Sequence, residues 1–290
     1  MSAFSATYER YRLDFERALN EACAGMDYRP AVLADSMRYS LLLGGKRLRP
    51  ILFFAMLETL GASHFGEENL AVALECIHTY SLIHDDLPAM DNDDFRRGMP
   101  SNHKKFGEAN AILAGDALLT YAAELLLQEC LKDEKHVRAG QVLLSAAGAD
   151  GMIAGQSADL MYTGTGGDEE TLFRLYAQKT GRLIAAPVRM AAILAGKCER
   201  EANAFGEELG ILFQLTDDIL DETGDEGKVG KTLGKDAQEG KLTCIKLFGL
   251  EKSKGLAADS AARCLAVLKE IEGDTDFLAE LVKSVRLRDK

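Results

Sequence analysis

The sequence of 290 residues contains no tryptophan, only five prolines, and six cysteines that form no Cys-x-x-Cys pair. Scattered single cysteines are typical of reduced core thiols in a cytoplasmic protein. No run of alternating polar and apolar residues is bounded by turn signals, so no segment favours a β-sheet. No uncharged stretch reaches the roughly 18 residues that a membrane helix needs, so we expect no membrane span.

Positive charge is in the minority, because 34 Lys and Arg against 46 Asp and Glu give a formal net charge of −12. Nucleic-acid phosphates attract basic surfaces, so this balance argues against nucleic acid as a partner. A local group of cations or metal ions can still bind a phosphorylated small molecule.

Apolar residues recur at steps of three and four along nearly the whole chain, which predicts an all-α protein. One apolar stripe runs from Phe4 to Ala22, and a second helix begins at Pro30 and ends at Gly44-Gly45. Several stretches are rich in Ala, Leu and Ile on more than one face, as in a helical bundle. No flexible linker is visible, so we expect one domain over residues 1–290. Further helices are expected at roughly 50–60, 67–87, 107–131, 137–159, 168–196, 199–224, 236–253, 255–271 and 274–289.

Two clusters of aspartates lie far apart in the chain. The first is Asp85-Asp86-Leu87-Pro88-Ala89-Met90-Asp91, and the second is Asp217-Asp218-Ile219-Leu220-Asp221. Each follows an apolar segment, so each is expected at the end of a buried helix. Asp217 and Asp221 share a helix face, where like charges repel unless a cation binds. Because Pro88 disturbs the helix, Asp85 and Asp91 can converge only at a bulge or a helix end.

One acidic cluster alone is usually a solvated surface. Here aspartate, a poor helix former, recurs beside basic residues, with Arg96-Arg97 after the first cluster and several lysines after the second. Few carboxylates, with phosphate oxygens completing the shell, suit Mg²⁺. An EF-hand at 91–102 fits poorly, because Arg96 stands at its glycine position and Asn102 at its glutamate position. If the two clusters face each other in a bundle, they form one polynuclear metal site for a diphosphate.

The turn Gly44-Gly45-Lys46-Arg47-Leu48-Arg49-Pro50 places three cations after two flexible residues. Such cations can simply complement the dipole at a helix C-terminus. The functional interpretation is a second diphosphate pocket without metal, formed by Lys46, Arg49 and Arg97. His78 lies two turns before Asp85 and can donate to the same group, although a lone histidine is more often a core residue.

Polar groups also occur within two other apolar helices. Lys179-Thr180-Gly181 lies in mid-helix, where a glycine costs about 1 kcal/mol relative to alanine, so a neighbour needs the space. Gln214 lies one turn before Asp218. Gln156 and Asp159 are three apart on a long apolar helix, where they are either buried and paired or line a site.

These motifs together resemble a known family. The glycine-rich turn, the two aspartate clusters and the segment His103-Lys104-Lys105-Phe106-Gly107-Glu108-Ala109-Asn110-Ala111-Ile112-Leu113-Ala114-Gly115-Asp116 are similar to those of the trans-isoprenyl diphosphate synthases. The similarity is closest to the bacterial short-chain farnesyl diphosphate synthases and runs from about residue 28 to the C-terminus. It implies an all-α bundle around a deep central cavity, a homodimer, and three Mg²⁺ ions.

The resemblance also implies a role for each matching residue. The metal ligands would be Asp85, Asp91 and Asp217, supported by Asp86, Asp218 and Asp221. The allylic diphosphate would bind to Arg96, Lys179, Lys231 and Lys241. Isopentenyl diphosphate would bind to Lys46, Arg49, His78 and Arg97. Thr180 and Gln214 would flank the reacting carbon.

The chemistry of a head-to-tail condensation agrees with this division. Breaking an allylic C–O bond leaves a carbocation and a diphosphate anion, whose charge is stabilised by fixed cations. A dry cavity protects the carbocation from water. The double bond of isopentenyl diphosphate then attacks, and the departed diphosphate can accept the proton. With dimethylallyl and geranyl diphosphates as primers, the expected product is farnesyl diphosphate.

Product length depends on how deep the cavity is. Tyr80 lies five residues before Asp85, roughly 7.5 Å along a helix. Its ring would close the pocket below the metals, as in farnesyl-producing members, while Ser81 beside it is small. Tyr80 can equally be an ordinary core residue. The same chemistry ending at the C10 or C20 product is therefore an alternative.

Other classes explain less of the sequence. A non-catalytic partner subunit should have damaged aspartate clusters, and both are intact. A terpene cyclase would not need the pocket at Lys46 and Arg49, and this chain lacks the tryptophan often abundant in cyclase cavities. A structural bundle does not explain charged clusters at helix ends. One departure is that Thr243 is followed by Cys244-Ile245, where the family usually has an aromatic residue and proline, which puts the local helix start in doubt.

Overall fold

The structure is a computed structural model that describes residues 2–224 and 240–288. In these ranges the chain is helical except for loops and one antiparallel pair of two-residue strands, β1 (Phe95–Arg96) and β2 (Met99–Pro100). The all-α prediction is therefore confirmed. The chain divides into two compact units, Met1–Phe54 with Ser63–Gly140 and Ala55–Ala62 with Gln141–Lys290. The single domain over residues 1–290 stays a prediction.

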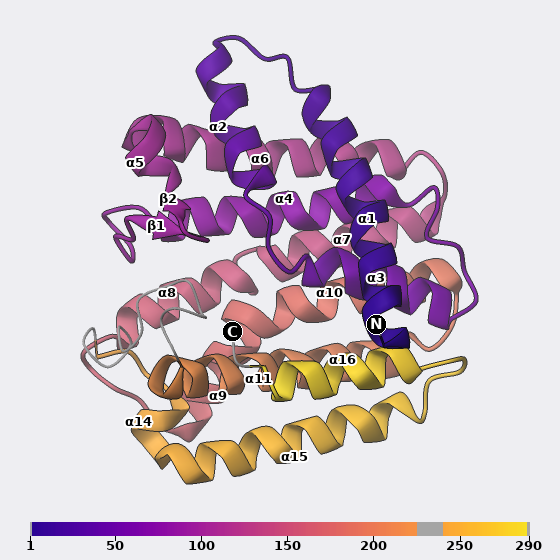
Figure 1. Cartoon of the computed structure of the whole chain (residues 1–290), viewed down its shortest axis with the longest axis vertical. Helices are drawn as coiled ribbons and strands as arrows, with labels where there is room; N and C mark the ends of the chain where they lie inside the picture. Colours follow the sequence, from indigo (N-terminus) through magenta and orange to yellow (C-terminus); the bar gives the residue numbers. More distant parts are fainter. Residues whose placement is uncertain (1, 225–239, 289–290) are drawn as a thin grey trace. The chain divides into compact units, whose positions relative to one another are not determined.

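The first unit is built on the pairing of α4 (Glu68–Asp85) with α6 (Glu108–Glu129), which run side by side in Figure 1. α4 is apolar around most of its circumference, and the buried face of α6 includes the small residues Ala111, Ala114 and Gly115. Small side chains let the two helices approach closely, which holds the C-terminal end of α4 in place. The other helices of this unit are α1 (Ala3–Ala24), α2 (Ala31–Leu42), α5 (Asn102–Phe106) and the first parts of α3 (Leu48–Thr59) and α7 (Glu134–Ala147).

The second unit is organised around α11 (Glu199–Thr223), which packs against α10 (Arg182–Ala195), α15 (Leu250–Leu268) and α16 (Asp276–Arg286). The buried side of α11 carries Phe205, Leu209 and Leu212 at helical spacing, followed by the buried Asp218 and Asp221. The aspartates thus continue the same inward face. The remaining described elements are α8 (Met152–Tyr162), α9 (Glu169–Tyr176), the π-helical segment η1 (Ala177–Gly181) and α14 (Cys244–Phe248).

Most helix boundaries agree with the sequence prediction, and the differences occur at glycines. The helix expected over 137–159 is divided, because α7 ends at Ala147 and α8 begins at Met152, with Gly148 and Gly151 between them. The helix expected over 236–253 is also divided in its described part, and it begins only at Cys244. Gly249 has φ 76° and separates α14 from α15, while residues 236–239 lie outside the described residues. α15 continues through the break that was expected at residue 254.

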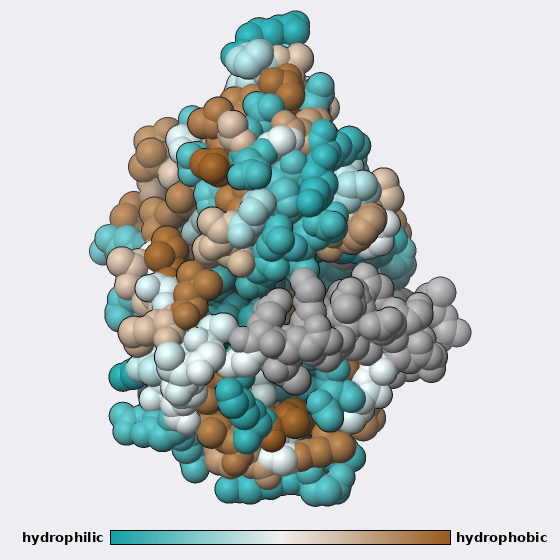
Figure 2. All heavy atoms as spheres, turned by 90° about the vertical axis from the view of Figure 1, so that its left-hand side faces the viewer, coloured by the Kyte–Doolittle hydropathy of each residue, from teal (hydrophilic) through white to brown (hydrophobic). Residues whose placement is uncertain are grey.

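The exposed surface includes several large hydrophobic side chains. On the face drawn in Figure 2, hydrophobic residues gather in patches between hydrophilic ones. Ile112, Leu113 and Leu127 of α6 are all exposed. By length and composition alone, α6 is the one helix among the described residues that is able to cross a membrane, and 39% of its apolar window is buried. The expected absence of a membrane span therefore stays a prediction.

Candidate active site

The first aspartate cluster lies where α4 ends. The helix stops at Asp85, and the backbone N–H of Asp91 donates to the carbonyl of Asp85 at 2.9 Å. Asn92, with φ 50°, reverses the chain, and its N–H donates to the Leu87 carbonyl at 3.1 Å. Because Pro88 is exposed on the loop, it disturbs no helical bond. Asp85 and Asp91 therefore converge at a helix end, one of the two arrangements that the sequence allowed.

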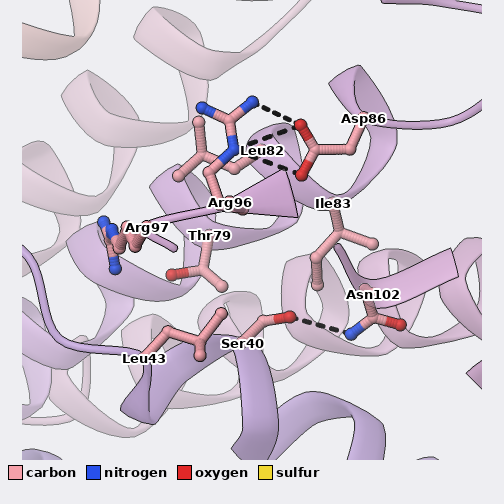
Figure 3. A pocket seen from close by; sticks show the side chains of 9 residues that line it. All are labelled: Ser40, Leu43, Thr79, Leu82, Ile83, Asp86, Arg96, Arg97 and Asn102. Atoms are coloured by element: carbon pink, nitrogen blue, oxygen red, sulfur yellow. Dashed lines mark hydrogen bonds and ion pairs between the residues drawn. The ribbon is translucent and has the colours of Figure 1, made fainter. Parts of the chain in front are cut away.

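Asp86 is directed into a pocket of the first unit, and Arg96 reaches it from the β1–β2 hairpin (Figure 3). The Nε of Arg96 donates to both carboxylate oxygens of Asp86, at 3.1 and 3.2 Å, and its Nη2 donates to Oδ1. Asp86 is only 2% exposed, and this burial raises its pKa, although the hydrogen bonds from Arg96 oppose the rise. The pocket is lined by Ser40, Leu43, Thr79, Leu82, Ile83, Asp86, Arg96, Arg97 and Asn102.

Arg97 points away from Asp86 in Figure 3 and reaches the glycine-rich turn. Its Nη1 donates to the carbonyl of Gly44, and its backbone has φ 54°. A Cβ on Gly45 would lie 2.6 Å from the Cζ of Arg97. The second glycine of the turn is therefore required for the guanidinium to pass.

Arg49 and His78 belong to the same positive group. Burial lowers the pKa of Arg49 to about 10, with Glu75 opposing and Arg97 adding to the effect. Burial also lowers the pKa of His78 well below its usual value, and Arg49 and Arg97 lower it further. The Nε of Arg49 is buried without a hydrogen-bond partner among the described residues. Cations that lower one another's pKa are stabilised by an anion, so this group suits a diphosphate held without metal.

The other two cations of the turn have different environments. The Arg47 side chain is fully buried and donates to Glu75 at 2.7 Å, to Glu16 at 2.8 Å and to the Leu41 carbonyl at 2.8 Å. Its three partners belong to the protein, so it is a structural cation. Lys46 is exposed, and its carbonyl accepts from the hydroxyl of Tyr8 at 2.5 Å.

The second cluster lies in the last turns of α11. Asp217 is partly exposed, whereas Asp218 and Asp221 are buried. Asp218 Oδ1 accepts from Gln214 Nε2 at 3.0 Å, and Asp218 Oδ2 accepts from the hydroxyl of Tyr176 and from the backbone N–H of Cys244 at 2.8 Å. Both oxygens of Asp218 are thus held by the protein.

The departure at Cys244-Ile245 leaves the local helix start intact. α14 begins at Cys244, and the side chain of Thr243 caps it by accepting from the N–H of Lys246 at 3.2 Å. A threonine N-cap needs no following aromatic residue or proline. The doubt that the sequence raised at this point is therefore resolved.

Lys179 and Thr180 lie on the π-helical segment η1, a type of irregularity that is frequent at functional sites. Thr180 Oγ1 donates to Gln214 at 2.8 Å, which joins Thr180 to Gln214 and Asp218 in one chain of hydrogen bonds. Lys179 Nζ donates to the buried Asp159 at 2.5 Å.

Two helices approach this segment at glycines. A Cβ on Gly155 of α8 would lie 2.7 Å from the Cβ of Lys179. A Cβ on Gly210 of α11 would collide with the Cα of Gly181. Glycine at 181 is therefore explained by close contact between two backbones, which is the neighbour that its mid-helix position predicted.

The C-terminal end of the described chain reaches the second cluster. Arg288 Nη2 donates to Asp217 Oδ1 at 3.1 Å and to the carbonyl of Phe213 at 2.9 Å, and its guanidinium lies 4.1 Å from the centroid of the Phe213 ring. Burial lowers the pKa of Arg288, and Asp217 opposes that effect. The sequence reasoning missed this residue, together with Tyr176. A basic end after an amphipathic helix was the available signal for Arg288, and Tyr176 had none.

Tyr80 and Ser81 lie on α4, about one turn before the first aspartate cluster. Tyr80 is 5% exposed, and its hydroxyl has no hydrogen-bond partner among the described residues. Ser81 donates to the carbonyl of His78 at 2.8 Å. An aromatic side chain with an unpartnered buried hydroxyl is unusual in a packed core, where such groups are normally paired.

The carboxylates of the two clusters fit Mg²⁺ in their chemistry. Asp85, Asp91 and Asp217 are partly exposed, as a ligand to an ion that keeps several waters must be. The buried Asp86 and Asp218 are instead hydrogen-bonded by protein side chains. The division into direct and supporting aspartates stays a prediction.

Another group of metal-ligand types occurs in the first unit, at Glu67, Glu129 and His136. Lys132 forms ion pairs with both glutamates, at 3.7 Å for Glu67 and more closely for Glu129. His136 Nδ1 bonds to Asp133 at 2.7 Å. Because an ammonium group already compensates both carboxylates, this group is a salt-bridge network and no metal is assigned to it.

The predicted site residues fall into two sets. The first unit contains Lys46, Arg49, His78, Tyr80, Ser81, Asp85, Asp86, Asp91, Arg96 and Arg97. The second contains Lys179, Thr180, Gln214, Asp217, Asp218, Asp221 and Lys241. Lys231 lies outside the described residues.

Comparison with known proteins gives consistent similarities. Residues 30–282 match the polyprenyl synthetase family. A farnesyl diphosphate synthase of Micrococcus luteus is 41% identical over 287 residues, covering 96% of this chain and 97% of the relative. Geranylgeranyl pyrophosphate synthase 4 of Arabidopsis thaliana is 44% identical over 265 residues, covering 87% and 70%. A geranyltransferase of Helicobacter pylori, solved in complex with magnesium and isoprenyl diphosphate, superposes with a TM-score of 0.86 at 33% identity, covering 98% and 97%.

Proposed function

Because this chain belongs to the polyprenyl synthetase family, we propose that it joins isopentenyl diphosphate head to tail to allylic diphosphates and makes farnesyl diphosphate. The observation that supports a condensation best is the presence of two different diphosphate-binding chemistries. The aspartate clusters suit a diphosphate bound through metal, and the group of Arg49, His78 and Arg97 suits one bound without metal. An enzyme that only ionised one prenyl diphosphate would have no use for the second group.

Asp85, Asp91 and Asp217 would hold Mg²⁺, three ions in all, with Asp86, Asp218 and Asp221 supporting them. When bound, the ions would supply positive charge for the departing diphosphate. The solved relative from Helicobacter pylori contains magnesium and an isoprenyl diphosphate, which supports this assignment.

The side chains of the protein would divide the remaining work. Arg96, Lys179, Lys231 and Lys241 would bind the allylic diphosphate. Arg49, Arg97, His78 and Lys46 would orient isopentenyl diphosphate so that its double bond faces the allylic carbon. The Thr180–Gln214 pair, joined at 2.8 Å, would flank that carbon. After the new C–C bond forms, the departed diphosphate would accept a proton from C2 of the isopentenyl unit, next to the cation at C3, so that the electrons of that C–H bond form the new double bond.

We infer a C15 product from Tyr80, whose buried ring lies just over one turn before Asp85 and would end the cavity for the growing chain. A C20 product is the second candidate, because geranylgeranyl pyrophosphate synthases reach 44% identity to this chain. A C10 product would require a shallower cavity.

We further propose that the protein is a cytoplasmic homodimer. The exposed Ile112, Leu113 and Leu127 of α6 provide apolar surface that a second copy would cover. All six cysteines are free, as expected in a reducing compartment. Light scattering of the purified protein at several concentrations would measure its mass, and Leu127→Arg should shift that mass toward the monomer.

A product assay tests the proposed function. The purified protein is incubated with isopentenyl diphosphate, Mg²⁺ and either dimethylallyl or geranyl diphosphate, and products are sized by chromatography with an EDTA control. We expect a metal-dependent C15 product. A C20 product would keep the mechanism and exclude Tyr80 as the floor, and no condensation with either primer would refute the proposal.

Variants connect the reaction to the clusters. Asp85→Ala and Asp217→Ala should each reduce kcat by orders of magnitude, on the order of the 10²–10³-fold that follows loss of one stabilising group. Asp259→Ala, an exposed aspartate on α15, is the matched control and should retain wild-type activity. Near-normal turnover in both cluster variants would remove the metal-site hypothesis.

A further inference from the structure

The segment 103–116 belongs to the motifs that mark the family, yet none of its residues has a role in the proposed reaction. Within it, Gly115 is a buried glycine near the middle of α6, where glycine lowers helix stability relative to alanine. The packing of α6 on α4 shows what uses the space. A Cβ on Gly115 would lie 2.5 Å from Cδ2 and 2.8 Å from Cε1 of His84, and closer still to its Nε2.

His84 is thus seated in a notch that Gly115 leaves on α6. Its Nε2 donates to the backbone carbonyl of Ile112 at 3.0 Å, and it lies 3.9 Å from Asp116 Oδ1. Because the Ile112 carbonyl is fixed in a helix, the hydrogen bond sets the orientation of the imidazole ring.

The imidazole of His84 also meets the ring of Tyr80, the residue proposed as the cavity floor. The rings of Tyr80 and His84 are one helical turn apart on α4, with centroids 5.8 Å apart and an interplanar angle of 76°. The Tyr80 hydroxyl has no hydrogen-bond partner among the described residues. No polar contact there fixes the tyrosine ring, so its position depends on packing, to which His84 contributes an edge-to-face contact.

We propose that His84, seated in the Gly115 notch, positions the ring of Tyr80 and is thereby a second determinant of product length. This inference rests on the proposed function. It assigns a role to Gly115 and to His84 that differs from metal binding, although His84 directly precedes Asp85. Loss of the notch would release His84 from Ile112, loosen Tyr80 and deepen the cavity.

The test is a double-mutant cycle with product length as the readout. Gly115→Ala, His84→Ala and the double variant are assayed with geranyl and isopentenyl diphosphates. In Gly115→Ala the ratio of C20 to C15 product should rise by roughly tenfold, the order expected from one lost hydrogen bond, while kcat for the first condensation stays within about threefold. His84→Ala should give the same shift. In the double variant the space that His84 occupied is empty, so Gly115→Ala should then leave product length unchanged and should gain up to about 1 kcal/mol of stability from helix propensity instead of losing any.

The chain provides a matched control in Gly140, a buried glycine of α7. A Cβ there would meet its neighbours at 3.8 Å or more, which is ordinary contact. Gly140→Ala should therefore keep the wild-type product. His84→Gln retains an amide donor for Ile112 without the ring, so it should show whether the ring contact with Tyr80 is required, and it too should lengthen the product.

The outcomes separate this inference from the proposed function. If wild type fails to condense its substrates, both fail. If wild type makes the C15 product but Gly115→Ala and His84→Ala leave it unchanged, the proposed function stands and this inference is wrong. Equal effects of Gly115→Ala with and without His84 would also overturn it, because the effect would then not pass through the imidazole.

Discussion

Two arginines of one motif should respond in opposite ways to the same substitution. Arg47→Gln removes the cation that compensates Glu75, whose side chain is 1% exposed. Breaking a buried ion pair costs about 3–5 kcal/mol, because the remaining charge stays buried without its partner. We expect a loss of this order in the free energy of unfolding, and little change in substrate affinity beyond what the lower stability causes.

Arg49→Gln should stabilise the protein and weaken substrate binding. Burial lowers the pKa of Arg49 to about 10, so the folded protein disfavours this charge. One pKa unit corresponds to about 1.4 kcal/mol, so the difference from the usual value of 12.5 sets an upper limit of about 3.5 kcal/mol on the gain in stability. Loss of packing around the aliphatic part of the side chain reduces the expected gain to about 1 kcal/mol. A charge-assisted hydrogen bond contributes about 1.5–3 kcal/mol, so KM for isopentenyl diphosphate should rise by about 10–100-fold.

Urea unfolding in metal-free buffer and steady-state kinetics with each substrate varied in turn would measure both effects. KM for geranyl diphosphate should change little in Arg49→Gln, since that substrate is assigned to other cations. Arg200→Gln is the control, because the Arg200 side chain is 87% exposed in its pair with Glu201, and it should change stability by less than about 0.5 kcal/mol. If Arg49→Gln loses as much stability as Arg47→Gln and keeps its KM for isopentenyl diphosphate, the division of the motif into a structural and a binding arginine is refuted.

Two further predictions concern packing and pH. Gly210→Ala should lower the free energy of unfolding by about 1–3 kcal/mol and reduce kcat, because its Cβ would displace Gly181 on η1. The control is Gly255→Ala on α15, where the added Cβ has open space and should raise the free energy of unfolding by up to about 1 kcal/mol. If urea unfolding shows equal gains for the two variants, the close approach of Gly210 to Gly181 is contradicted. The folded protein lowers the pKa of His78. As pH falls below about 6.5, the imidazole therefore takes up a proton in the unfolded chain but not in the folded one. His78 thus makes the protein less stable as pH falls below about 6.5. A bound diphosphate reverses this preference, so calorimetry without Mg²⁺ should show that inorganic pyrophosphate binds with proton uptake and more tightly at pH 6 than at pH 7.5. His78→Asn should abolish both dependences, and identical profiles for the two proteins would exclude His78 from the site.

The sequence predicted local features of the site well because their causes are local. A proline in a helical stretch indicates where the helix must end, and α4 ends three residues before Pro88. The i,i+4 spacing of Asp217 and Asp221 depends only on helix geometry. The Thr243 cap of α14 follows an equally local rule, but it was overlooked in the expectation of one helix over 236–253. In each case the physical rule involves residues within one or two turns of each other.

Contacts between distant segments could not be predicted in the same way. Nothing near Tyr176 in the sequence indicates that its hydroxyl bonds to Asp218. Asp159 was recognised as either paired or lining a site, and the structure pairs it with Lys179, twenty residues later. The C-terminal Arg288 meets Asp217 across a long stretch of chain. Periodicity shows which face of a helix is buried, but it does not identify the residue from another helix that it meets.

Glycines within helices and turns give partial information about contacts between distant segments. A mid-helix glycine is locally unfavourable, so the sequence can indicate that something approaches there, although not what. In this structure Gly45 leaves room for the side chain of Arg97, and Gly155 leaves room for the backbone of Lys179. Arg97 and Lys179 were already candidates for the site. Gly140 shows that the inference is not automatic, since only ordinary contacts surround it. A collision of the added Cβ therefore shows that a neighbour uses the space, but not that this neighbour is functional, because Gly206 makes room in the same way for Ala185 and Val188 of the core. What singles out His84 at Gly115 is its further contact with the ring of Tyr80.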